Sequence, residues 1–340
     1  MKAIGSVCKK IFKKKRETDI DAELLLAYSL QSDKELTKID YSSVLEKEHS
    51  ITGDPCPNRV PTYRYFDGSW KEVDPQEEEF NSMNTKSLTF YTQNIWFESH
   101  NAAERFETLV QMALDTDADF VCFQEATGPF LKELTENEGI RKKYYISGNG
   151  IRGYGVVIIS KLPAYFFEFK YECTSMGRSL LVGEVSINSD ENEDSTFLVG
   201  TSHLESLNNA ALRKDQMEYY IDPILGKYDS IFMGDFNFMY HWKNEEDTLN
   251  RELFSDMWEE LRDSSEEQFT MFKTPEYAEV TFDHIILSLK SKFRPEYIER
   301  VGNFSCDAYK EQDPKDINTD GVVRTPSDHL GLVGVINLKE

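Results

Sequence analysis

The chain has 340 residues, 39% of them apolar, and a formal charge of −23 at pH 7. This length suits one large domain with at most a short appendage, and the charge argues against a broad, salt-sensitive grip on nucleic acid. No apolar run is long enough to span a bilayer and no secretory signal is visible, so we expect no stable membrane association. The five cysteines are scattered without a CxxC pair, which favours a reducing compartment, nucleus or cytosol.

The first sixteen residues carry seven Lys/Arg and no acid. Such asymmetry is typical of an interaction tail, and three interpretations stay open: a nuclear address, a weak contact with anionic membrane or nucleic acid, and a solvated disordered tail. Residues 19–31 predict a short helix with an acidic start and several leucines. This helix is similar to ubiquitin-binding helices, although its Ala and Ser fall at other spacings, so ubiquitin or another protein is a candidate partner.

Residues 32–86 are polar and rich in proline and glutamate, which predicts a linker. Their aromatic residues, Tyr63, Tyr65, Phe66 and Trp70, indicate that part of this linker packs on the domain surface. We therefore divide the chain into residues 1–86, which hold the basic tail, the short acidic helix and the linker, and a folded domain over residues 87–340.

From Ser87 onward the pattern becomes regular. Apolar runs of strand length, each with a polar terminus, cover residues 88–94, 120–125, 155–160, 180–187, 196–203, 230–235, 280–287 and 330–338. Residues 101–116, 209–225 and 249–262 have the apolar spacing of packed helices. Strands that alternate with helices and hairpins predict a layered α/β domain.

Polar residues suited to catalysis fall at or near the ends of these runs. Four of them close a run: Asn94, Glu125, His203 and Asp235. Asp283 lies inside a run, and Asp328 and His329 precede the last run. Ligand sites of α/β proteins favour such sheet edges. A lone acid at a strand end is usually a turn residue or a helix cap, so the prediction of a common site depends on the whole set.

The set suits hydrolysis of a phosphodiester, which requires a hard cation, an oriented water and donors for the developing negative charge. Glu125 suits Mg²⁺, which takes oxygen ligands, and the lack of thiolates favours Mg²⁺ or Mn²⁺ over Zn²⁺. Asp235 and Asn237 lie two apart and would point the same way in an extended segment. The carboxylate could orient or deprotonate water, while the amide donates to a phosphate oxygen.

His329 could donate to the phosphoryl group, provided that an acid fixes its tautomer and raises its pKa. Asp283 is the partner that we favour for this role. Pairing of Asp283 with His284 or Arg294 is the alternative.

The ordered motifs TQN (92–94), FQE (123–125), TSHLES (201–206), GDFN (234–237), FDHI (282–285) and PSDHLGL (326–332) resemble the endonuclease/exonuclease/phosphatase superfamily. TSHLES and PSDHLGL are most similar to the type 2 tyrosyl-DNA phosphodiesterases, which release tyrosine from DNA 5′ ends. The resemblance covers roughly residues 88–338. It implies a four-layer αββα sandwich with two packed, mostly antiparallel sheets, and it makes residues 87–340 the catalytic domain.

The resemblance also implies a role for each matching residue. Glu125 and Asp328 would bind the metal; Asn94, His203, Asp235, Asn237 and His329 would act on water and phosphate, with Asp283 orienting His329; and Arg178, Asn94 and Asn237 would face the substrate. Gln93 departs from the Trp common before the motif Asn, and no N-terminal ubiquitin-associated domain is recognisable.

The leading interpretation is therefore a monomeric, Mg²⁺-dependent enzyme of the nucleus, with the cytoplasm as a second location. Its partner would be a single-stranded 5′ DNA end bearing tyrosine or a topoisomerase peptide, which it would leave with a 5′-phosphate. Other superfamily substrates are alternatives: nuclease substrates such as abasic-site DNA, messenger-RNA tails, phosphoinositides and sphingomyelin. The competing class is a non-catalytic scaffold of the same fold.

Overall fold

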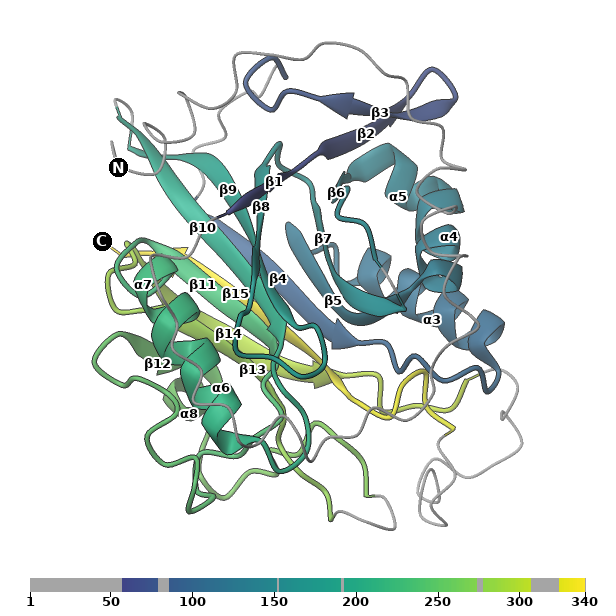
Figure 1. The fold of residues 1–340 in the computed structure, drawn as a ribbon. Helices are drawn as coiled ribbons and strands as arrows, with labels where there is room; N and C mark the ends of the chain where they lie inside the picture. The colour runs from purple at the N-terminus through teal and green to yellow at the C-terminus, as the bar shows by residue number, and fades with distance from the viewer. Residues whose placement is uncertain are drawn as a thin grey trace.

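The computed structural model describes residues 57–78, 86–151, 153–190, 193–273, 278–306 and 324–339. Within these ranges, two β-sheets pack face to face and helices cover their outer faces (Figure 1). The basic tail and the helix expected over residues 19–31 lie outside the described residues. Among the helices described, none combines the length and the apolar character needed to cross a membrane.

One sheet has seven described strands, in the order β1 (Asn58–Val60), β8 (Tyr165–Lys170), β9 (Ser179–Asp190), β10 (Glu193–His203), β11 (Ser230–Asp235), β13 (Asp283–Ser288) and β12 (Phe254–Asp256). The other has eight, in the order β14 (Phe293–Val301), β15 (Gly331–Leu338), β4 (Ser87–Asn94), β5 (Phe120–Thr127), β7 (Tyr154–Ser160), β6 (Tyr145–Ser147), β2 (Thr62–Phe66) and β3 (Ser69–Val73). The pairs β4–β5 and β10–β11 are parallel, and the other described pairs are antiparallel.

Side chains alternate between the two faces of each strand, which builds apolar layers on both sides of each sheet. Phe90 and Cys122 point inward to meet Leu181 and Ile231 of the opposite sheet. The next residue along β4, Tyr91, points outward. This alternation gives the sandwich one central core and two outer cores.

The two outer cores lie under separate groups of helices. The eight-stranded sheet packs against α3 (Ala102–Asp115), α4 (Gly128–Glu136) and α5 (Glu138–Lys143). The seven-stranded sheet packs against α6 (Ala210–Gln216), the π-helical turn η2 (Met217–Ile221) and α7 (Asp222–Ile224). A short helix, α8 (Met257–Leu261), contributes to the central core at the sheet edge. The fold is the four-layer αββα sandwich that the sequence motifs implied.

Residues 57–73 differ from the expected linker, because they supply three strands of the sandwich. β1 pairs with β8, and the β2–β3 hairpin extends the eight-stranded sheet. Tyr63 and Trp70 are each only 3% exposed, and Trp70 Nε1 donates to the carbonyl of Thr135 at 3.0 Å. A domain boundary after residue 86 is therefore too late. The sequence concealed these strands because they are short and lie at or next to a sheet edge, where charged residues are tolerated.

The segment 249–262 also differs from its expected single helix. It contains β12 and the short α8, which starts only after Asp256. The Asp256 carboxylate accepts hydrogen bonds from the backbone N–H groups of Trp258 and Glu259, so it caps the helix at this point. The expected strand over 280–287 likewise begins at Asp283.

Candidate active site

The seven-stranded sheet aligns three of the expected site residues in one row. His203 lies opposite Asp235 in the parallel pair β10–β11, and Asp283 lies opposite Asp235 in the antiparallel pair β11–β13. Gly234 permits this close approach: its φ is +150°, and a Cβ there would lie 2.1 Å from the carbonyl oxygen of Ser202. The row ends the sheet at one end of the sandwich.

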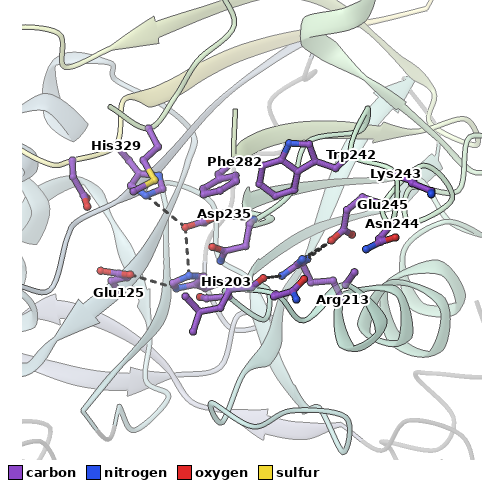
Figure 2. Close-up of a pocket in the computed structure, with 17 residues that line it drawn as sticks. Glu125, His203, Arg213, Asp235, Trp242, Lys243, Asn244, Glu245, Phe282 and His329 are labelled. Carbon is purple, nitrogen blue, oxygen red and sulfur yellow. Dashed lines mark hydrogen bonds and ion pairs between the residues drawn. The ribbon is translucent and has the colours of Figure 1, made fainter. Parts of the chain in front are cut away.

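The eight-stranded sheet brings the remaining groups to the same end. Asn94 ends β4, and Asp328 and His329 lie just before β15, separated from it by Leu330. Glu125 lies in β5 where the pairing with β7 shifts register, and its φ of +58° turns it out of the strand pattern. In Figure 2, Glu125, His203, Asp235 and His329 face one another.

Six of the expected site residues line a cavity of about 450 Å³. The expected residues on its wall are Glu125, His203, Asp235, Asn237, Asp328 and His329, and the wall also contains Ser206, Asn208, Arg213, Trp242, Lys243, Met271 and Phe282. The residues of this second group were not predicted as site residues from the sequence. Trp242 and Lys243 follow the GDFN motif closely, which is the one signal that could have indicated them.

Asp235 is the centre of the hydrogen-bond network. Its Oδ2 accepts from Asn94 Nδ2 at 2.9 Å, and its Oδ1 accepts from the backbone N–H of Asn237 at 2.9 Å. The same Oδ2 lies 3.4 Å from His203 Nε2 and 3.9 Å from His329 Nε2. Burial raises the pKa of Asp235, while the nearby His329 opposes that rise. A carboxylate whose pKa is raised toward neutrality suits a general base.

His203 is held as a neutral imidazole with a defined tautomer. Burial and then the positive charges of Arg178 and His329 lower the pKa of His203 well below its usual value. Arg178 Nη1 lies 2.8 Å from His203 Nδ1. Because a guanidinium can only donate, Nδ1 must accept, which leaves the imidazole proton on Nε2. His203 therefore directs an N–H toward Asp235.

His329, in contrast to His203, is held as a protonated, cationic imidazole. Burial would lower the pKa of His329, but Asp283 and Asp235 outweigh it and raise that pKa well above the usual value. His329 Nδ1 lies 2.7 Å from Asp283 Oδ2, so Asp283 is its partner, and the Nε2–H faces the pocket. Two Nε2–H donors, one neutral and one cationic, thus converge on the same region beside Asp235.

Glu125 and Asp328 fit a hard cation. Both line the cavity, and burial raises the pKa of Glu125. Burial, together with repulsion from Glu125, raises the pKa of Asp328 to about 6, against the opposing charge of His329. A divalent cation held by both carboxylates would remove this repulsion, and oxygen ligands suit Mg²⁺.

A second acidic cluster nearby fits a cation less well. Asp235, Asp283 and His329 bring one ligand atom each within 4.8 Å of one another. Asp283 is, however, bound to the Nδ1–H of His329, and the raised pKa of His329 keeps its imidazole protonated. A protonated imidazole has no free lone pair for a metal ion, so we favour Glu125 and Asp328 over this cluster as the metal ligands.

Arg178 lies behind His203. Arg178 is 6% exposed, donates to Ser206 Oγ at 2.8 Å and lines a neighbouring cavity rather than the one beside Asp235.

Gln93 links two strands of the site. Gln93 Nε2 donates to the carbonyls of Asn94 and His329. The residue that departs from the motif therefore ties the end of β4 to the start of β15.

Arg105 holds two loops of the site and was not predicted from the sequence. This buried guanidinium donates to five carbonyls, those of Ile95, Trp96, Glu98, His100 and Pro326. The first four belong to the loop after Asn94, and the last precedes Asp328. The available signal was an arginine next to Phe106, among the apolar residues of an amphipathic helix.

We expect Arg105→Met to lower the free energy of unfolding by about 3 kcal/mol, because several buried carbonyls lose a charged donor. Chemical denaturation measures the change. Arg64→Met is the matched control: the Arg64 side chain is 48% exposed and pairs with Glu78 at the surface, so its loss is expected to cost less than about 1 kcal/mol. Equal losses in the two variants would contradict this account.

Comparisons with known proteins agree with this architecture. The family model for the Endonuclease/Exonuclease/phosphatase family matches residues 91–329. The structure of D. rerio TDP2 complexed with single-strand DNA product is 21% identical, covers 74% of this chain and 100% of that chain, and gives a TM-score of 0.61. Truncated Caenorhabditis elegans TDP2 is 17% identical, with 74% and 97% covered and a TM-score of 0.57.

An endonuclease/exonuclease/phosphatase family protein from Bacteroides thetaiotaomicron is also similar, at 17% identity, with 75% of this chain and 98% of that chain covered and a TM-score of 0.54. No curated protein sequence matches the chain. The match of the family model extends over most of the chain, from Tyr91 in β4 to His329. The chain belongs to the endonuclease/exonuclease/phosphatase family.

Proposed function

We propose that this protein is a Mg²⁺-dependent phosphodiesterase that hydrolyses 5′-phosphotyrosyl-DNA bonds and leaves a 5′-phosphate. The observation that carries the proposal is the convergence of a carboxylate, Asp235, with the Nε2–H groups of His203 and His329, beside the carboxylates of Glu125 and Asp328. The likeness in fold to TDP2, one structure of which holds a single-strand DNA product, supports this substrate class. Repair of topoisomerase-linked ends would place the protein in the nucleus.

The chemistry divides among these side chains. Asp235 takes a proton from the attacking water as the water oxygen bonds to phosphorus. The bond from phosphorus to the tyrosyl oxygen breaks, and tyrosinate leaves with the electron pair. His203 and His329 donate hydrogen bonds to the phosphoryl oxygens, where negative charge develops. When bound at Glu125 and Asp328, Mg²⁺ supplies further positive charge to the phosphate.

Tyrosinate is a better leaving group than an alkoxide, so the site needs no strong acid for the leaving oxygen. The cavity of about 450 Å³ suits one phosphodiester and its immediate neighbours. Besides His329, the described wall carries the cations Lys243 and Arg213, and Arg213 is already paired with Glu245. This modest positive charge favours a short single-stranded end over an extended grip on duplex DNA.

The direct test is to incubate the protein with a 5′-tyrosyl oligonucleotide and Mg²⁺ and to measure release of tyrosine and the new 5′-phosphate. We expect multiple turnovers. Hydrolysis of another phosphodiester, such as a phosphoinositide, without release of tyrosine would remove the tyrosyl assignment. A protein that cleaves none of these diesters would favour the non-catalytic scaffold.

Metal removal gives a separate prediction. Thorough chelation is expected to abolish tyrosine release, and Mg²⁺ or Mn²⁺ is expected to restore it, because carboxylate oxygens prefer these hard cations. The measurement is the rate of tyrosine release as each ion is titrated back into the metal-free protein. Activity that survives chelation, or that only Zn²⁺ restores, would contradict the assignment of the metal to Glu125 and Asp328.

A further inference from the structure

Phe97 is a large apolar side chain exposed at the edge of the candidate active site. Its exposed fraction is 42%. Its backbone N–H donates to Glu125 Oε2 at 2.9 Å, which places the residue directly beside a carboxylate of the site. The catalytic steps described above do not use this ring.

The Phe97 ring is the outer member of a stack that reaches His203. Its centroid lies 5.2 Å from that of Tyr154, with an angle of 8° between the ring planes. The guanidinium carbon of Arg178 lies 5.1 Å from the Tyr154 centroid, and Arg178 Nη1 lies 2.8 Å from His203 Nδ1. We call Phe97 and Tyr154 the aromatic shelf. It leaves the ring of Phe97 accessible at the edge of the site.

The loop that carries Phe97 is held firmly. Arg105 donates to the carbonyls of Ile95, Trp96 and Glu98, on both sides of Phe97. Trp96 has a φ of +57°, a left-handed conformation that bulky residues rarely adopt and that persists only where its surroundings impose it. The exposed position of Phe97 is therefore fixed by buried contacts, as a preformed binding surface requires.

The aromatic shelf lies on the side of the site from which a leaving group would depart. His203 Nε2 faces Asp235 at 3.4 Å, whereas His203 Nδ1 faces Arg178 and lies 3.9 Å from Glu125. Asp235 receives the proton of the attacking water. In phosphoryl transfer the attacking and leaving oxygens are roughly in line. The leaving oxygen thus lies away from Asp235, toward Glu125 and the aromatic shelf.

We propose that the aromatic shelf binds the phenol ring of the departing tyrosyl group, which stacks on the exposed face of Phe97. This proposal rests on the proposed function and deepens it, because it assigns a subsite to the leaving group. Parallel, offset rings attract one another beyond the effect of apolar burial. An enzyme with this subsite would distinguish an aromatic from an aliphatic leaving group by binding as well as by acidity.

The experiment compares the same enzyme variants on three oligonucleotide substrates. The first carries 5′-tyrosine, the second carries a fluorinated aliphatic alcohol with an acidity close to that of phenol, and the third carries 5′-tyrosine next to an abasic terminal nucleotide. The variants are Phe97→Ala, Phe97→Leu, which keeps an apolar side chain without the ring, and Phe97→Tyr, which restores a ring. Phe66→Ala is the matched control, because Phe66 is 41% exposed and lies on the β2–β3 hairpin.

We expect Phe97→Ala and Phe97→Leu to lower kcat/KM about tenfold on both tyrosyl substrates and less than about threefold on the aliphatic one. Phe97→Tyr should restore the rate, and Phe66→Ala should leave it unchanged. Equal losses on all three substrates, or no loss on any, would overturn the assignment of the aromatic shelf. A loss that disappears with the abasic substrate would assign Phe97 to a nucleobase instead. Wild-type cleavage of the aliphatic diester alone would overturn the proposed function as well.

Discussion

Asp235→Asn is expected to lower kcat for tyrosine release about 1,000-fold, with little change in KM. The variant keeps the size of the side chain but cannot take a proton from water. It also disturbs the network, because Asn94 Nδ2 and the Asn237 N–H now donate to Asp235, and an amide offers them only one acceptor oxygen. Steady-state kinetics on the 5′-tyrosyl oligonucleotide measures the loss.

A matched control separates this chemical effect from a general loss of structure. Asp229 immediately precedes the same strand and accepts a hydrogen bond from Ser291 Oγ at 2.6 Å, away from the site. Asp229→Asn should therefore change stability more than activity. If Asp235→Asn keeps more than about a tenth of the wild-type kcat, Asp235 is not the base. Cellular function that survives Asp235→Asn would favour the scaffold interpretation.

The sequence was a good guide to the central strands because their apolar runs are buried on both faces. The run over residues 230–235, for example, is buried at every position of β11. Such strands leave a signal that does not depend on their neighbours. The β2–β3 hairpin carries no comparable signal, since Arg64, Phe66 and Glu72 are exposed at the sheet edge. Only its buried aromatic residues, Tyr63 and Trp70, indicated from the sequence that this segment packs on the domain.

The site was predictable as a set of residues but not as a set of protonation states. Motif order predicted that Glu125, His203, Asp235 and His329 belong together. The tautomer of His203 depends on Arg178, which comes from a loop 25 positions away in the chain and reaches the imidazole only in three dimensions. The turn of Glu125 into the pocket likewise depends on a register shift between β5 and β7, which no local pattern of apolar residues reveals.

Substitutions of Asp283 and His329 are expected to have non-additive effects on kcat/KM. His329→Gln should lower kcat/KM several-hundred-fold, about the effect of removing one donor to a developing oxyanion. Asp283→Asn should lower it about tenfold, because Asp283 positions the imidazole and favours its charged form without touching substrate. In the double variant, the loss of Asp283 should add almost nothing to the loss of His329, since its effect acts through that imidazole. The values of kcat/KM for the wild type, the two single variants and the double variant form a double-mutant cycle that measures this.

The neighbouring residue of the same strand supplies the control for this cycle. His284 Nδ1 lies 2.9 Å from Asp256 Oδ2, so it forms a second buried carboxylate–imidazole pair, but it packs among Phe236, Phe238 and Tyr240. His284→Gln should lower the melting temperature and leave kcat/KM within about twofold, because its partner lies outside the catalytic pocket. Additive losses for Asp283 and His329 would mean that the carboxylate acts on the reaction independently of the imidazole. An equal loss of activity in His284→Gln would mean that the cycle reports folding rather than catalysis.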